Sequence, residues 1–130
     1  MKKIKSVLFI LNVIFIASCS SSNDDNSSNP VKPNIVAKWG LYSSTSSNGT
    51  ETPCKDFPNC KIMEFKTNGT LLFTEWGDFN IMKYTIDDDI LDVKWENNDP
   101  HHTYKIILLD NEYLKLDLLD GRKNYYKKIN

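Results

Sequence analysis

Short apolar runs alternate with polar residues through most of the chain after Ile35. The runs are rich in Ile, Val, Phe, Tyr, Trp and Leu, and Asn-Gly, Asp-Gly or clusters of Asp and Asn separate them. This pattern is typical of β-strands joined by tight hairpins. It predicts eight strands: Val36–Tyr42, Lys61–Lys66, Thr70–Trp76, Asn80–Ile86, Ile90–Glu96, Thr103–Leu109, Tyr113–Leu119 and Lys123–Ile129.

The order of these runs favours an all-β fold, because no stretch after Ile35 has the periodicity of an amphipathic helix. Most connections are short, so strands that follow each other in sequence are expected to pair antiparallel. Closing the sheet removes both of its edges. We therefore predict an eight-stranded antiparallel up-and-down barrel, with a two-sheet sandwich as the alternative.

Turn lengths set which side chains face inward, because opposed residues of a hairpin share one face of the sheet. A two-residue turn at Asn68-Gly69 places Phe65 opposite Leu72, with Trp76 further along the same inner face. The opposite, outer face of this hairpin then carries an apolar group and two carboxylates: Ile62, Glu64, Leu71, Phe73 and Glu75.

Two later hairpins give apolar inner faces in the same way. With Asp88-Asp89 as a turn, each inner residue of one strand opposes one of the other: Ile86 and Leu91, Tyr84 and Val93, Met82 and Trp95. A three-residue loop over Asp110–Glu112 pairs Leu108 with Leu114, Ile106 with Leu116 and Tyr104 with Leu118. A two-residue loop there would set Ile106 against a lysine, so we reject it. At Asp120-Gly121 either Tyr125 or Tyr126 can share a face with Leu116.

The predicted inner face carries six aromatic residues, which are the candidate ligand-binding residues: Trp39, Phe65, Trp76, Tyr84, Trp95 and Tyr104. One interpretation is that they fill the barrel as core. The other is that some of them line a pocket for a small, partly apolar ligand at the open end. An eight-stranded barrel is wide enough for either.

The outward apolar group Ile62, Leu71 and Phe73 supports a different kind of function. An exposed apolar patch indicates a protein partner or a covering loop. The alternative to ligand capture is therefore an interaction or inhibitor module with a filled barrel that works through its rim loops.

The first residues have the pattern of a secretory signal. Lys2, Lys3 and Lys5 precede an apolar run from Val7 to Ile16, and small residues follow. The run is too short for a stable bilayer span, which needs roughly 20 apolar residues.

The sequence Ile16-Ala17-Ser18-Cys19 resembles a bacterial lipobox, which implies cleavage before Cys19 and lipidation of its thiol. The alternative is an ordinary secreted protein with a free Cys19. The predicted parts are a signal peptide (1–18), a polar lipid-anchored tether (19–34) and the barrel (35–130). Asp24-Asp25 resembles an acidic surface-export tag, so the cell surface and the periplasmic face of the outer membrane both stay open.

Charge excludes one class of partner. The chain has 16 Lys and Arg against 17 Asp and Glu, and removal of residues 1–18 takes away three lysines and no acids. A mildly acidic domain lacks the basic stripe that nucleic-acid binding requires.

Cys54 and Cys60 are the cysteines that remain once Cys19 carries lipid. An even pair in an exported domain predicts a disulfide, and without nearby histidines the pair lacks the ligands for zinc. The bond would stiffen the long first connection at one rim of the barrel.

No metal, cofactor or catalytic machinery is predicted. His101 and His102 are interpreted as a solvated loop, and Asp87-Asp88-Asp89 as a hairpin turn that lacks the spacing of a calcium loop. No serine follows Ser47, and Glu64 and Glu75 fall on the predicted outer face. We therefore expect a protein that is not an enzyme.

Several segments together resemble the small lipocalin-like lipoproteins of Bacteroidetes: Ile35-Val36-Ala37-Lys38-Trp39-Gly40-Leu41, Cys60–Phe65, Asn68-Gly69-Thr70, Tyr84-Thr85-Ile86, Tyr113–Leu116 and Tyr125–Lys128. The resemblance spans roughly residues 35–130. Ala37 stands where that family usually has glycine. The resemblance implies a lipocalin-like barrel that acts as a binding protein at the outer membrane.

Overall fold

The computed structural model describes residues 34–95 and 101–130. The predicted signal peptide, the lipidation site Cys19 and the tether up to residue 33 lie outside the described residues, as does Glu96 at the end of one predicted strand. Within the described ranges, no helix has the length and apolar character that a membrane crossing needs.

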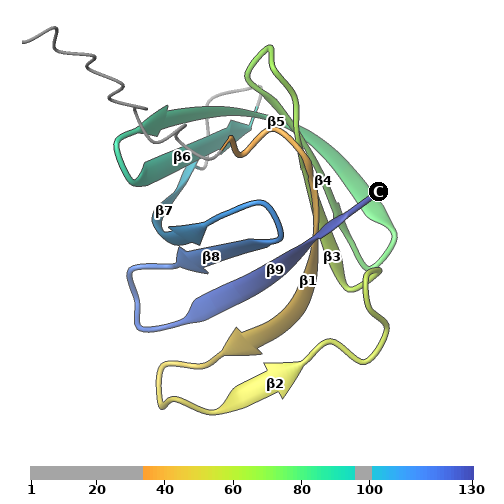
Figure 1. Ribbon diagram of the computed structural model, residues 1–130, viewed down its shortest axis with the longest axis vertical. Helices are drawn as coiled ribbons and strands as arrows, with labels where there is room; N and C mark the ends of the chain where they lie inside the picture. The colour runs from red at the N-terminus through yellow and green to blue at the C-terminus, as the bar shows by residue number, and fades with distance from the viewer. Residues whose placement is uncertain (1–33, 96–100) are drawn as a thin grey trace, which may run out of the picture. The chain divides into compact units, whose positions relative to one another are not determined.

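The described residues form nine β-strands: β1 (Lys38–Thr45), β2 (Glu51–Pro53), β3 (Lys61–Phe65), β4 (Thr70–Glu75), β5 (Asp78–Asp87), β6 (Ile90–Trp95), β7 (His101–Leu109), β8 (Tyr113–Asp117) and β9 (Lys123–Ile129). From β3 to β9, each strand pairs antiparallel with the next in sequence. Figure 1 shows them winding in succession around one axis.

Pairing of β1 with both β3 and β9 closes the sheet into a barrel of eight strands. This confirms the predicted all-β, antiparallel up-and-down barrel. The short β2 was not predicted; it pairs only with the second half of β1, where Ser43 opposes Pro53. Figure 1 shows β2 and its loop as an appendage beside β1.

The turn between β3 and β4 has three residues, and the predicted two-residue turn is wrong. The Lys66 amide donates to the Thr70 carbonyl (2.8 Å), and the Gly69 amide donates to the Lys66 carbonyl (3.2 Å). Gly69 has a φ of 80°, which residues with a Cβ rarely adopt. Phe65 therefore opposes Leu71, one residue earlier than predicted.

This shift of one residue exchanges the two faces of β4, because side chains alternate along a strand. Leu71 is fully buried and Phe73 packs against the core, so the predicted outward placement of both residues is wrong. Trp76 lies outside with 76% of its surface exposed, so its predicted inner placement is also wrong. Ile62 opposes Gly40 and Thr74, on the outer face as predicted.

The turn between β5 and β6 has the predicted length. Met82 opposes Trp95, Tyr84 opposes Val93, and Ile86 opposes Leu91. Asp88 takes a positive φ of 56° at the turn, a conformation that Asp tolerates better than most residues.

The connection between β7 and β8 combines a short turn with a bulge. The Asp110 amide donates to the Tyr113 carbonyl (3.0 Å), so the loop has two residues, Asn111 and Glu112, and the predicted three-residue loop is wrong. A shift between Ile106 and Leu108 adds one residue to β7 and keeps Ile106 opposite Leu116, as predicted. Leu108 opposes Lys115 and is 45% exposed, so its predicted pairing with Leu114 is wrong.

The hairpin of β8 and β9 settles the open choice between two tyrosines. Tyr126 opposes Leu114 and is buried, whereas Leu116 opposes Asn124. Tyr126 therefore faces the barrel interior with Leu114 and Leu116.

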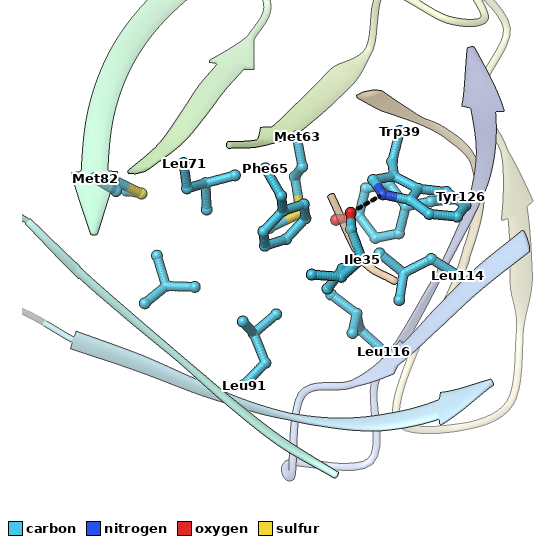
Figure 2. Close-up of a cluster of buried hydrophobic side chains, with 11 residues drawn as sticks. Ile35, Trp39, Met63, Phe65, Leu71, Met82, Leu91, Leu114, Leu116 and Tyr126 are labelled. Carbon is cyan, nitrogen blue, oxygen red and sulfur yellow. Dashed lines mark hydrogen bonds between the residues drawn. The ribbon is translucent and has the colours of Figure 1, made fainter. Parts of the chain in front are cut away.

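One end of the barrel is closed by the segment that precedes β1. The Trp39 side chain is fully buried, and its indole Nε1 donates to the Ile35 carbonyl at 2.8 Å. The Phe65 amide donates to the Ala37 carbonyl (2.9 Å), which holds this segment across the end of β3. In Figure 2, Trp39 lies with Tyr126 at one side of the buried cluster and Met82 at the other.

The predicted disulfide joins Cys54 and Cys60, whose Cα atoms are 6.1 Å apart. The bridged loop packs on the outer side of β1 at Gly40. A Cβ added there would lie 2.7 Å from the Pro58 Cβ and 3.3 Å from the Phe57 ring. Glycine at this position lets the loop lie directly on the strand.

We expect Cys54→Ser to lower the free energy of unfolding by about 2 kcal/mol, since it releases a short covalent loop. For a domain of this size the Tm falls by roughly 10 °C. Circular dichroism should show an unchanged strand content, and Cys60→Ser should behave in the same way. A variant as stable as the parent under oxidising conditions would argue against a structural role for the bridge.

Candidate functional site

A cavity of about 490 Å³ occupies the end of the barrel away from the Ile35 and Trp39 plug. Its lining comes from strands β3 to β7 and from the β8–β9 connection. The first residue of β3 and the last residues of β4 and β6 contribute to it, which places the mouth at their common end of the sheet.

The floor of the cavity is apolar. It consists of four buried core side chains: Met63, Leu71, Met82 and Val93. Each comes from a different strand, so the floor is fixed by the pairing of β3 to β6 and not by a loop. Two of them, Leu71 and Met82, oppose each other directly.

Aromatic side chains form the walls above this floor. Phe73, Trp95 and Tyr104 line the cavity and pack partly buried against the core. Trp95 and Tyr104 belong to the set of six residues that the sequence predicts to bind ligand. Phe73 was missed because the predicted register turned it outward.

The other four predicted residues do not line the cavity. Trp39 and Phe65 belong to the packed core. Tyr84 stacks edge-on against Phe65 with ring centroids 4.9 Å apart, and its hydroxyl donates to the Lys66 carbonyl (2.7 Å). Trp76 is on the outside. Part of the predicted aromatic set is therefore core, and fewer of its members line the cavity than the sequence predicted.

An inward ion pair stands at the mouth of the cavity. Lys61 and Glu75 oppose each other on β3 and β4, and the lysine Nζ is 3.0 Å from Glu75 Oε1. The same Nζ lies 5.5 Å from the centre of the Phe73 ring, within range of a cation–π contact. The predicted outward placement of Glu75 is wrong for the same reason as for Phe73.

A second charge pair comes from the β8–β9 connection. Arg122 Nε donates to Asp120 Oδ2 at 2.7 Å, Nη2 forms an ion pair with the same oxygen at 2.6 Å, and the Arg122 amide donates to Oδ1 at 2.9 Å. These hydrogen bonds lower the pKa of Asp120 and raise the pKa of Arg122. Both side chains line the cavity, and the turn fixes the guanidinium at its edge.

His102 also lines the cavity and was not predicted there. The predicted solvated loop is wrong, because β7 begins at His101. His102 opposes Val93, which lies on the inner face, and its ring centroid is 6.3 Å from that of Tyr104. The alternation of His102, Tyr104 and Ile106 was the sequence signal that could have found it.

Two tyrosines, Tyr104 at the cavity and Tyr126 in the core, have hydroxyl groups with a raised pKa. Burial raises the pKa of the Tyr104 hydroxyl, the Glu75 carboxylate raises it further, and Arg122 lowers it. Burial also raises the pKa of the Tyr126 hydroxyl, which accepts a hydrogen bond from Asn124 Nδ2 (3.2 Å). Both hydroxyls therefore stay protonated at neutral pH.

A second, mostly apolar hollow of about 410 Å³ lies beside the disulfide. Leu41, Pro53, Cys54, Cys60 and the exposed Trp76 contribute to it. On the outer face of β5, Phe79 opposes Thr74 and Ile81 opposes Leu72, and they are 58% and 47% exposed.

Within residues 34–95 and 101–130, no three His, Cys, Asp or Glu side chains gather in a way that could hold a metal ion. Of Asp87-Asp88-Asp89, Asp87 ends β5 and the other two form the turn to β6.

No protein-family model matches the chain, and no curated protein matches it. Two solved structures are similar. An uncharacterized protein from Bacteroides eggerthii superposes with a TM-score of 0.58 at 16% identity, over 74% of this chain and 100% of that one. A lipocalin-like protein from Bacteroides uniformis gives a TM-score of 0.58 at 18% identity, over 73% and 98%. These likenesses show a lipocalin-like fold.

The raised pKa of Tyr126 makes a prediction for alkaline stability. The unfolded chain loses the tyrosine proton near pH 10 while the folded protein keeps it, so stability is complete below about pH 10 and falls above it. Tyr126→Phe should flatten this fall by up to about 1.4 kcal/mol per pH unit. Urea denaturation of parent and variant on both sides of that pH measures it; equal slopes would contradict the assignment.

Proposed function

We propose that the protein is a lipid-anchored, extracytoplasmic binding protein that captures a small, partly apolar ligand in the open end of its barrel. It belongs in this view with the lipocalin-like lipoproteins of Bacteroidetes and acts at the outer membrane, on the cell surface or the periplasmic face. It carries out no chemistry on the ligand.

The observation that carries this proposal is the cavity of about 490 Å³. Pockets for small molecules begin near roughly 300 Å³, and a barrel filled by its own side chains would leave far less space. The floor offers apolar contact through Met63, Leu71, Met82 and Val93, and the mouth offers polar groups that can orient a ligand.

Binding can be tested with decanol, a neutral probe with an apolar tail. Trp95 lines the cavity, whereas Trp39 is buried in the core. A Trp76→Phe background removes the exposed emitter. Changes of emission on ligand binding then report on Trp95. We expect saturable quenching or a shift of its emission. Val93→Phe should abolish the response, because the added ring projects from the floor into the cavity.

A matched control is Thr74→Phe, which adds a ring on β4 at a position that opposes Ile62 on the outer face. It should leave decanol binding unchanged. Circular dichroism and the Tm establish that both variants fold. The proposal of ligand capture fails if neither decanol nor a charged probe with the same tail produces a saturable response, or if both phenylalanine variants reduce binding equally.

A second candidate function is protein interaction through the outer surface. The specific observation that favours it is Trp76, which is 76% exposed and lines the apolar hollow at the disulfide. Native mass spectrometry of protein purified without denaturant separates the two functions. A small molecule that Val93→Phe removes supports capture, whereas a protein that Trp76→Ala removes supports interaction.

The anchor is tested independently of the ligand. In cells that process lipoproteins, radioactive palmitate should label the full chain, and Cys19→Ser should abolish the label because the acylated thiol is lost. Cys54→Ser is the matched control, since that cysteine is in a disulfide of the barrel. Labelling that persists in Cys19→Ser would show that the anchor is elsewhere.

A further inference from the structure

The mouth of the cavity has free hydrogen-bond donors, whereas its two carboxylates are each paired with a cation. This difference bears on the ligand that the proposed capture function would select. The donors belong to Arg122, Lys61, Tyr104 and Trp95, which all line the cavity. The inference rests on that proposed function and adds the chemistry of the ligand's polar end.

Arg122 is the largest source of free donors. A guanidinium carries five N–H donors, and two of its nitrogens bind Asp120. No further partner for the guanidinium is found among the described residues. Because Asp120 holds the group from one side and the backbone turn fixes Asp120, the remaining donors are oriented before any ligand arrives.

Lys61, Tyr104 and Trp95 add further hydrogen-bond donors at the mouth. The Lys61 ammonium has three donors, and Glu75 takes one of them at 3.0 Å. Among residues 34–95 and 101–130, the Tyr104 hydroxyl and the Trp95 indole nitrogen have no hydrogen-bond partner. Burial favours the protonated hydroxyl of Tyr104, so it stays available as a donor.

The two carboxylates at the mouth each have a cationic partner. Asp120 accepts from Arg122 through both carboxylate oxygens. Glu75 pairs with Lys61, whose ammonium also lies against the Phe73 ring. The place where a cationic ligand would find a carboxylate and an aromatic face together is thus occupied by the protein's own lysine.

We propose that the ligand is an anionic amphiphile, with a carboxylate head that Arg122 and Lys61 bind at the mouth and an unbranched apolar tail on the floor. A carboxylate fits these donors because guanidinium and carboxylate pair in a planar, two-bonded geometry. The tail reaches Met63, Leu71 and Met82, which are buried at the bottom of the cavity.

The cavity volume limits the length of this molecule. About 490 Å³ corresponds to about sixteen water-sized groups at roughly 30 Å³ each. Decanoate, with about twelve non-hydrogen atoms, fits within that limit. Much longer chains would leave part of the tail outside the barrel.

Three probes with the same tail test the head group: decanoate, decanol and decylammonium. Affinities are measured at neutral pH by Trp95 emission in the Trp76→Phe background. We expect decanoate to bind about tenfold more tightly than decanol, as for a charge-assisted hydrogen bond, and decylammonium to bind most weakly. Added sodium chloride should weaken decanoate binding and leave decanol binding unchanged.

Arg122→Gln should remove the advantage of decanoate over decanol, and Lys61→Gln should reduce that advantage. Lys115→Gln is the matched control, because Lys115 lies over the Tyr125 ring and away from the cavity. If decanol binds as tightly as decanoate, or decylammonium binds more tightly, the anionic head is wrong and capture still stands. If none of the three binds, ligand capture itself fails.

Discussion

Alternation of side chains along a strand is the constraint on which the interior of this barrel depends. The three-residue turn between β3 and β4 decides which residues of β4 face inward, and the answer is Leu71, Phe73 and Glu75. These residues supply part of the cavity floor, an aromatic wall and one partner of the ion pair at the mouth. With a turn one residue shorter, Leu72, Thr74 and Trp76 would replace them, and the mouth would lose its Glu75 carboxylate.

The two ends of the barrel differ because different residues close them. At one end the segment before β1 crosses the opening, and the hydrogen bond from Trp39 to the Ile35 carbonyl satisfies a buried indole inside an apolar cluster. At the other end the inner positions carry charges, Lys61 and Glu75, which need water or each other. An apolar floor below a charged mouth is the arrangement that an amphiphilic ligand requires.

The sequence was sufficient to predict the all-β class, the antiparallel pairing of successive barrel strands, and the disulfide. Turn residues and apolar alternation are local signals, so they can be read without the rest of the fold. The length of a turn could not be predicted in the same way, since Asn68-Gly69 suits both a two-residue turn and a three-residue turn that ends at glycine. The bulges at Tyr42 and near Ile107 also depend on packing across the barrel. Of the predicted binding residues, Trp95 and Tyr104 reach the cavity; Phe73, Glu75 and His102 were missed because their register or strand assignment was wrong.

The most direct test of this account is the register of β3 against β4, measured by nuclear Overhauser effects between Hα protons. Lys66 and Thr70 form a hydrogen-bonded pair at the turn, so Met63 and Phe73 form a non-hydrogen-bonded pair with Cα atoms about 4.5 Å apart. The account predicts a strong Hα–Hα cross-peak between Met63 and Phe73. In a register shifted by one residue the close, non-hydrogen-bonded pair would be Glu64 and Phe73. A strong cross-peak between Glu64 and Phe73 in place of the predicted one would turn Phe73 and Glu75 outward and contradict the cavity.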